Sequence, residues 1–144
     1  MKARDTFWHI GVLVIVRDPA GAVLMIDHDG WQLPGGNAPP AEPVTRTAAR
    51  QLKEQTGLTP PLTHLVGLTQ NPAGAILLIL DGGTLTTDEV ATLRGAPTRH
   101  AWMAPRQLPH QQPHIAAALH AIDHGNELPL VRQEVAGSGY FASA

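Results

Sequence analysis

The pattern of hydrophobic and polar positions divides the chain into short strands and two longer helices. Residues 9–17 are β-branched and apolar at both odd and even positions, which predicts a central strand buried on both faces. A turn at 18–21 and a second apolar run at 22–27 predict that this strand is the first arm of a hairpin. Further extended segments are predicted at 31–33, 64–69, 75–80 and 99–103.

Helical spacing of apolar residues appears in two longer segments, 43–56 and 113–124. The first is expected to begin at Pro43, whose fixed φ suits a first helical residue, and to end at Gly57. A shorter helix over 86–95 is predicted to open with a capping box. The region between the 31–33 segment and the first helix, 36–42, is expected to be a loop.

This order of elements predicts an α+β fold in which a mixed β-sheet is sandwiched between α-helices. The length of 144 residues fits a single domain over 1–144. The small and polar residues from about 130 to 144 are expected to form a mobile C-terminal tail.

Composition narrows the function classes. Cysteine is absent, which excludes disulfides, thiolate metal ligands and cysteine nucleophiles. The formal net charge is −2 and no basic run occurs, so a nucleic-acid polymer is not an expected partner. The apolar stretch near the N-terminus is much shorter than a bilayer span, so we expect a cytoplasmic protein without a membrane partner.

One segment carries candidate chemistry. A loop rich in glycine and proline precedes the first long helix, on which Gln51, Glu54 and Gln55 share one face. Arg50 stands four residues before Glu54 and eight after Glu42, so it can brace either carboxylate. Such a loop, carboxylate and orienting arginine are suited to Mg²⁺ bound to phosphates, because Mg²⁺ binds through few carboxylates and the substrate's own oxygens.

The spacing of this segment resembles the Nudix box: glycine, five residues, glutamate, seven residues, Arg-Glu, an aliphatic, any residue, Glu-Glu, any residue, glycine and an aliphatic. Two positions depart, because Gln51 and Gln55 stand where the box has glutamates. Residues 31–35 resemble the usual lead-in to the box. The matching positions are Gly36, Glu42, Arg50, Leu52, Glu54, Gly57 and Leu58.

The resemblance implies a Nudix fold and hydrolysis of a pyrophosphate bond in a nucleotide or other small diphosphate. It also implies Mg²⁺ or Mn²⁺, with Glu54 as the intact carboxylate, Gln51 and Gln55 in the other ligand positions, and Gly35 offering its carbonyl. Glu42 and Arg50 would complete the catalytic set as a supporting ion pair. Gly35 and Gly36 would contact the substrate, and a homodimer is a further possibility.

The two glutamines change what is expected. An amide oxygen can still ligate Mg²⁺, but it carries no formal charge and cannot act as a general base. We therefore expect weak metal binding and attenuated hydrolysis. Two alternatives stay open: a Nudix-fold module that binds a nucleotide without cleaving it, or an enzyme that uses the pocket for other chemistry. Glu54 could also be only an exposed partner of Arg50, and the glutamines only exposed helix residues.

Aromatic and histidine residues offer weaker signals. Trp31 borders the glycine-rich loop and is a candidate for stacking on a base, whereas Trp102 is expected to belong to the core. Two histidine pairs have a spacing that can bind Zn²⁺, but an exposed helix face is the stronger interpretation of both. The pairs are His110 with His114 and His120 with His124.

Overall fold

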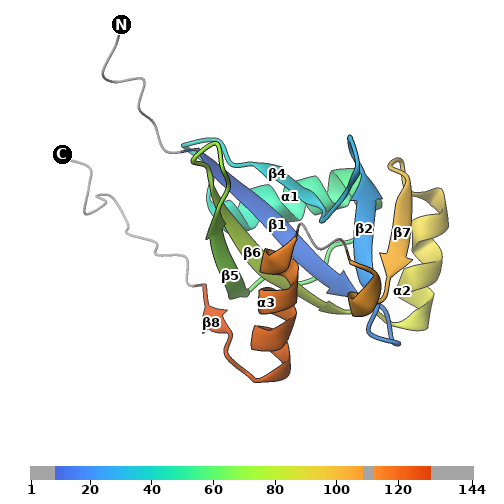
Figure 1. Ribbon diagram of the computed structural model, residues 1–144. Helices are drawn as coiled ribbons and strands as arrows, with labels where there is room; N and C mark the ends of the chain where they lie inside the picture. The colour runs from blue at the N-terminus through green and yellow to red at the C-terminus, as the bar shows by residue number, and fades with distance from the viewer. Residues whose placement is uncertain (1–8, 109–111, 131–144) are drawn as a thin grey trace, which may run out of the picture.

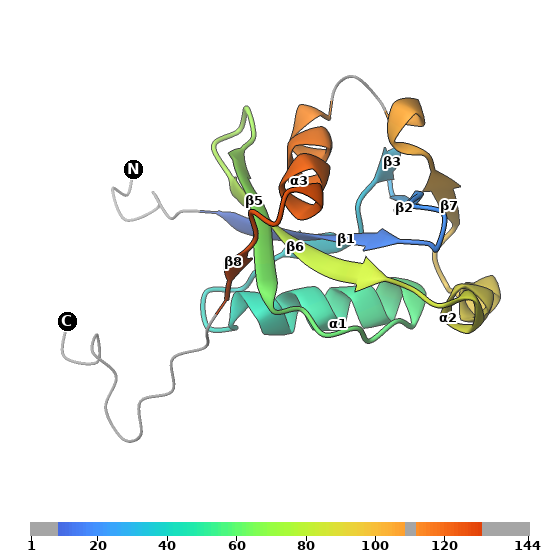
Figure 2. The same cartoon turned by 90° about the horizontal axis from the view of Figure 1, so that it is seen from below.

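A mixed β-sheet lies between helix α1 on one face and helix α3 on the other (Figures 1 and 2). The computed structural model describes residues 9–108 and 112–130. The predicted α+β architecture is confirmed. The elements are β1 Ile10–Arg17, β2 Val23–Asp27, β3 Trp31–Gln32, β4 Gly35–Asn37, α1 Val44–Thr56, β5 His64–Gln70, β6 Ile76–Thr84, α2 Thr87–Thr92, β7 His100–Met103, α3 Pro113–Asp123 and β8 Leu128–Pro129, with short 3₁₀ turns at Leu93–Gly95 and Pro105–Gln107.

Strand β1 is the centre of the sheet, whose order is β3-β2-β1-β6-β5-β8. It runs parallel to β6 and antiparallel to β2, and β4 pairs antiparallel with its first half. Its side chains enter two cores. Val12, Val14 and Val16 pack with Leu52 of α1, while Ile15 belongs to a second cluster on the α3 face. The prediction of a strand buried on both faces is therefore confirmed.

Helix α1 has the predicted stop signal. Gly57 follows the helix in the left-handed conformation, with φ 81°, and its N–H donates to the Lys53 carbonyl at 2.8 Å. Pro43 lies just before the helix with ψ 141°, so it caps the helix instead of being its first residue as predicted. Ala48 and Leu52 are fully buried and hold the helix against the sheet.

Three stretches of strand were not predicted. Gly35–Asn37 forms β4, although 36–42 was expected to be loop, because its backbone pairs with β1 and its residues carry no hydrophobic pattern. Strand β6 continues to Thr84, and Leu128–Pro129 forms β8 beside β5. Of the expected mobile tail, residues 131–144 lie outside the described residues, and the single domain over 1–144 stays a prediction.

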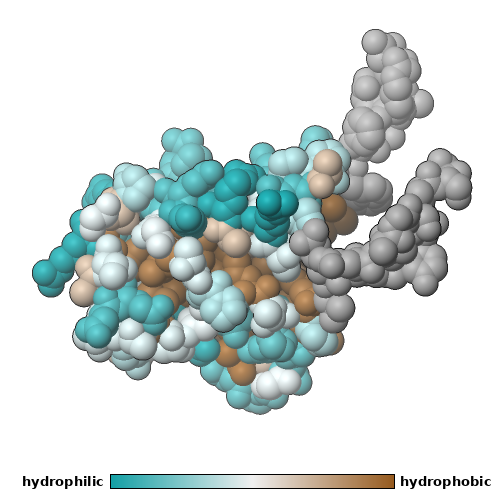
Figure 3. Space-filling model, turned by 180° about the vertical axis from the view of Figure 1, so that it is seen from behind, coloured by the Kyte–Doolittle hydropathy of each residue, from teal (hydrophilic) through white to brown (hydrophobic). Residues whose placement is uncertain are grey.

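The face that carries α1 is hydrophilic in its upper part and shows a band of hydrophobic residues across its middle (Figure 3).

Helix α2 begins with the predicted capping box, in which the side chains of Thr86 and Glu89 each form a hydrogen bond with the other residue's main-chain N–H. Within residues 9–108 and 112–130, no helix has the length and apolar character needed to cross a bilayer.

Candidate functional site

Strand β4 lies close to strand β1 at Gly35 and close to helix α1 at Gly36. Gly35 has φ 150°, and a Cβ there would lie 1.9 Å from the Val12 carbonyl oxygen. A Cβ on Gly36 would lie 2.9 Å from Cδ of Gln51. A side chain at position 35 would collide with the backbone of β1, and one at position 36 would displace the Gln51 side chain, which explains why both close approaches favour glycine.

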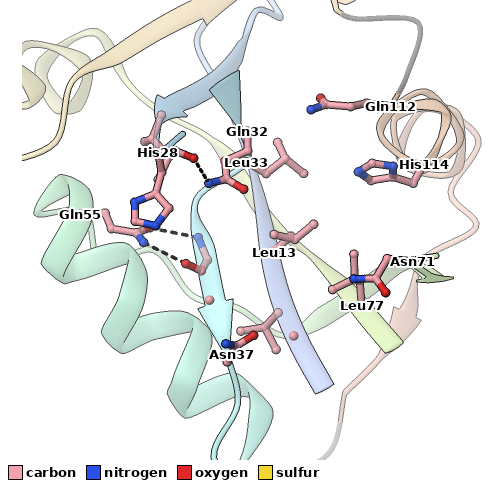
Figure 4. Close-up of a pocket in the computed structure, with 15 residues that line it drawn as sticks. Leu13, His28, Gln32, Leu33, Asn37, Gln55, Asn71, Leu77, Gln112 and His114 are labelled. Carbon is pink, nitrogen blue, oxygen red and sulfur yellow. Dashed lines mark hydrogen bonds between the residues drawn. The ribbon is translucent and has the colours of Figure 1, made fainter. Parts of the chain in front are cut away.

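Gln55 joins the helix to the strand through both ends of its amide. Its Nε2 donates to the Gly35 carbonyl at 2.8 Å, and the Gly35 N–H donates to its Oε1 at 3.0 Å (Figure 4). The same Nε2 lies 3.5 Å from Oε1 of Gln51. The two glutamines therefore face the glycine strand and are not merely exposed helix residues.

Glu42 and Arg50 form the ion pair expected from the sequence. The arginine donates to both carboxylate oxygens, from Nη2 to Oε1 at 2.9 Å and from Nε to Oε2 at 3.3 Å. Thr47 Oγ1 also donates to Oε1 at 2.6 Å. These hydrogen bonds, first of all the one from Arg50, hold the pKa of Glu42 below its ordinary value. The pair ties the segment before α1 to the helix.

Glu54 lies on the other side of this arginine. Its Oε1 is 3.6 Å from Arg50 Nη1, and its side chain is 59% exposed. Arg50 thus contacts both carboxylates, as the spacing allowed. Gln51 and Gln55 contact the glycines, whereas Glu54 pairs with Arg50, so the three expected ligands make different contacts.

The present residues do not fit a preformed site for a divalent cation. Gly35 was expected to offer its carbonyl to the ion, but that oxygen already accepts a hydrogen bond from Gln55 Nε2. Glu54 is the sole carboxylate among the three expected side-chain ligands. In the described part of the chain, no three carboxylate or imidazole groups gather where they could hold a metal.

A cavity of about 420 Å³ opens beside the same glycines, between β1 and the start of α3. Its polar side chains are amides and imidazoles, with no carboxylate, lysine or arginine among the lining residues. Burial lowers the pKa of His114, so this ring is neutral at pH 7. Besides the glycines and apolar residues, the lining side chains are His28, Gln32, Asn37, Gln55, Asn71, Gln112 and His114.

Gln112 carries an unused acceptor at this cavity. Its Nε2 donates to the Trp31 carbonyl at 3.2 Å, while its Oε1 is buried and has no hydrogen-bond partner among the described residues. Gln112 and His114 both point from the start of α3 toward the strands in Figure 4. A buried acceptor without a donor is unfavourable, so this oxygen is a strained feature of the cavity wall.

The tryptophans are placed as follows. Trp31 packs against the core cluster on the α3 face, and the Arg99 guanidinium carbon lies 5.4 Å from the centre of its ring. Its role in stacking on a base stays a prediction. Trp102 is partly buried against the α1-side core, as expected.

The two histidines at the end of α3 stack on each other. His120 and His124 stack with ring centres 3.9 Å apart, and His124 Nδ1 lies 2.9 Å from the His120 carbonyl. Stacked rings do not converge on one ion, which favours the exposed-face interpretation. His110, of the other pair, lies outside the described residues.

Most of the cavity's polar residues were missed by sequence reasoning. His28 lies in the turn before β3, Gln32 ends β3, Asn71 follows β5, and Gln112 precedes α3. They come from three separate segments of the chain, so no sequence signal links them. The unbroken run of polar residues before Pro113 was the one hint that Gln112 caps a helix end.

Known proteins resemble this chain in both sequence and fold. A Bacillus subtilis (strain 168) protein named "Putative 8-oxo-dGTP diphosphatase" is 28% identical over 102 residues, which cover 69% of this chain and 68% of that protein. A MutT protein from Methanosarcina mazei Go1 has a similar structure, with TM-score 0.59 and 20% identity over 83% of this chain and 95% of that one. A NUDIX hydrolase from Nitrosomonas europaea gives TM-score 0.63 and 18% identity over 92% and 100%.

A protein-family model matches most of the chain. The model of the NUDIX domain matches residues 7–124, from just before β1 to the residue after α3. This range includes the β4–α1 contact, the Glu42–Arg50 pair and the cavity. On this match, the chain belongs to the Nudix family.

Proposed function

We propose that this chain binds a nucleotide-like diphosphate and cleaves its pyrophosphate bond with low efficiency. The observation that carries the proposal is that Arg50 of α1 keeps its ion pairs with Glu42 and Glu54, while two neutral amides stand at the other two acidic positions of the box. The supporting framework is intact, and the negative charge that would attract a divalent ion is reduced.

The cavity supports a nucleoside as the bound group. Its volume of about 420 Å³ lies in the range of small-molecule sites. Amide groups and the neutral His114 ring donate and accept hydrogen bonds without charge, which suits the edge of a heterocyclic base better than a phosphate. The similarity to the Bacillus subtilis protein makes 8-oxo-dGTP one substrate to test.

The phosphates would then extend from the cavity past Gly35 and Gly36, which line its edge. Mg²⁺ or Mn²⁺ would be held weakly, because Glu54 is exposed and already paired with Arg50. Such an ion would depend on the substrate's own phosphate oxygens for most of its ligands. In the absence of substrate, we expect calorimetry to detect no tight binding of either ion.

A second candidate function is binding without cleavage. The hydrogen bond from Gln55 Nε2 to the Gly35 carbonyl favours it, because the family resemblance assigns that carbonyl to the metal. A cytoplasmic location and a homodimer stay predictions under either function.

The test is a release assay over a panel of diphosphates. Purified protein would be incubated with 8-oxo-dGTP and with nucleoside diphosphates linked to a sugar or a second nucleoside, in Mg²⁺, Mn²⁺ or EDTA. Slow, cation-dependent release that is lost in Glu54→Gln supports the proposal. Saturable calorimetric binding without release supports the second candidate. Neither binding nor release of any member would overturn both.

A further inference from the structure

We infer that the Gln55 side-chain amide substitutes for a cation, so that helix α1 closes onto strand β4 without a divalent ion. The inference concerns the ligand-free protein. It therefore stands or fails separately from the identity of the substrate and from the rate of hydrolysis.

The direction of the amide is fixed by its partners. Gly35 presents an N–H and a carbonyl oxygen, at 3.0 and 2.8 Å from the two ends of the Gln55 amide. The N–H requires an acceptor and the carbonyl requires a donor. Only the orientation with Oε1 toward the N–H and Nε2 toward the carbonyl satisfies both groups.

A carboxylate at this position could satisfy only one of the two groups. It would accept from the Gly35 N–H, but its second oxygen would face the Gly35 carbonyl oxygen. Two acceptors at hydrogen-bond distance need a proton or a cation between them, because each carries negative partial charge. The Nε2–H of Gln55 supplies that positive charge from within the chain.

Neighbouring contacts show that the closed arrangement is built into the chain. Gly36 lies so close to Gln51 that a Cβ would be 2.9 Å from its Cδ. Gln51 Oε1 in turn lies 3.5 Å from Gln55 Nε2, which gives this nitrogen a second acceptor. The two amide hydrogens of Gln55 are thus directed to two oxygens of the chain itself.

The test compares the thermal stability of three proteins in EDTA and in Mn²⁺. We expect the wild type to unfold at the same temperature in both. Gln55→Glu should unfold roughly 3 to 8 °C lower in EDTA, because a partly buried acceptor loses its donor. Mn²⁺ should restore most of that loss, because an ion can bridge the new carboxylate and the Gly35 carbonyl. Gln55→Met should be destabilised in both solutions, with no rescue.

Gln70→Glu is the matched control. Gln70 also donates its Nε2 to a glycine carbonyl, that of Gly74 at 3.2 Å, but at an exposed loop away from α1. The same change of charge there should give no response to Mn²⁺. Hydrogen exchange at the Gly35 amide supplies a second measurement, and the wild type should protect it equally in EDTA and in Mn²⁺.

Several results would overturn the inference. One such result is that Mn²⁺ raises the unfolding temperature of the wild type as much as that of Gln55→Glu. Another is that Gln55→Glu unfolds at the wild-type temperature in EDTA, or that its unfolding temperature does not change when Mn²⁺ is added. If Gln55→Glu folds only when Mn²⁺ is present, the inference is supported in its strongest form. If Gln55→Glu folds in neither solution, hydrogen exchange of the wild-type protein decides. Faster exchange of the Gly35 amide in EDTA than in Mn²⁺ would overturn the inference, and equal exchange in the two solutions would support it.

Discussion

The side-chain amide of Gln55 exchanges two hydrogen bonds with the main-chain N–H and C=O of Gly35, as a hydrogen-bonded pair of residues does between antiparallel strands. The residues are twenty positions apart, one near the end of α1 and the other at the start of β4. Each group gives one donor and one acceptor, and none of the four atoms is left without a partner. This pair positions the glycine strand at the edge of the cavity.

Gly36→Ala tests how tightly the strand and the helix are packed. The new Cβ would lie 2.9 Å from Gln51 Cδ, so the glutamine must move or the strand must shift. We expect the free energy of unfolding to fall by about 1 to 3 kcal/mol, as for overpacked cores. Chemical denaturation measures this loss directly.

A double variant and a control identify the cause. Gly36→Ala should cost clearly less in a Gln51→Ala background, since the obstructing side chain is gone. Gly95→Ala should be close to neutral, because a Cβ at Gly95 meets no atom within 4 Å. Equal losses in both backgrounds would mean that Gln51 is not the obstacle.

Glu42 should stabilise the fold in a pH-dependent way. Its pKa is lowered in the folded protein, first by the hydrogen bond from Arg50. Its contribution is therefore fully present above the ordinary glutamate pKa, about 4.3, and is lost as the pH falls through the lowered value. The difference in unfolding free energy between wild type and Glu42→Gln should shrink toward acid pH. A difference that stays constant from pH 7 to pH 3 would contradict the supporting role of the pair.

Glu127 should behave in the opposite sense. A hydrogen bond with Asp81, burial and the Asp81 charge raise its pKa. A raised pKa means that the protonated form is favoured in the folded state, so its stabilising contribution is present below about pH 4.3 and is lost as the pH rises through the raised value. Glu127→Gln should therefore be more stable than the wild type at neutral pH. Equal stability of the two proteins from pH 4 to pH 8, measured by denaturation, would refute this.

Much of the fold could be predicted from the sequence because local patterns determined it. The apolar run of β1, the proline and glycine around α1 and the capping box of α2 each act within a few residues. Strand β4 could not be predicted in the same way. Its glycines carry no pattern, and it exists because Val12 and Leu13 offer backbone partners across the sheet.

The candidate site likewise contains one contact that could be predicted from the sequence and others that could not. The Glu42–Arg50 pair follows from spacing on one helix and the segment before it. The Gln55–Gly35 pair could not be foreseen, since spacing placed Gln55 among ligands for an ion, whereas only the tertiary contact shows that its amide has a partner. His28, Asn71 and Gln112 meet at the cavity from three loops, and their convergence depends on the whole sheet.

The most direct test of the proposed function restores the two missing charges. In Gln51→Glu combined with Gln55→Glu, we expect Mn²⁺- or Mg²⁺-dependent release from a diphosphate substrate to rise roughly a hundredfold, which corresponds to about 3 kcal/mol of transition-state stabilisation. The gain should disappear when Glu54→Gln is added. A double variant that binds Mn²⁺ yet leaves every diphosphate intact would contradict a hydrolase weakened by lost charge.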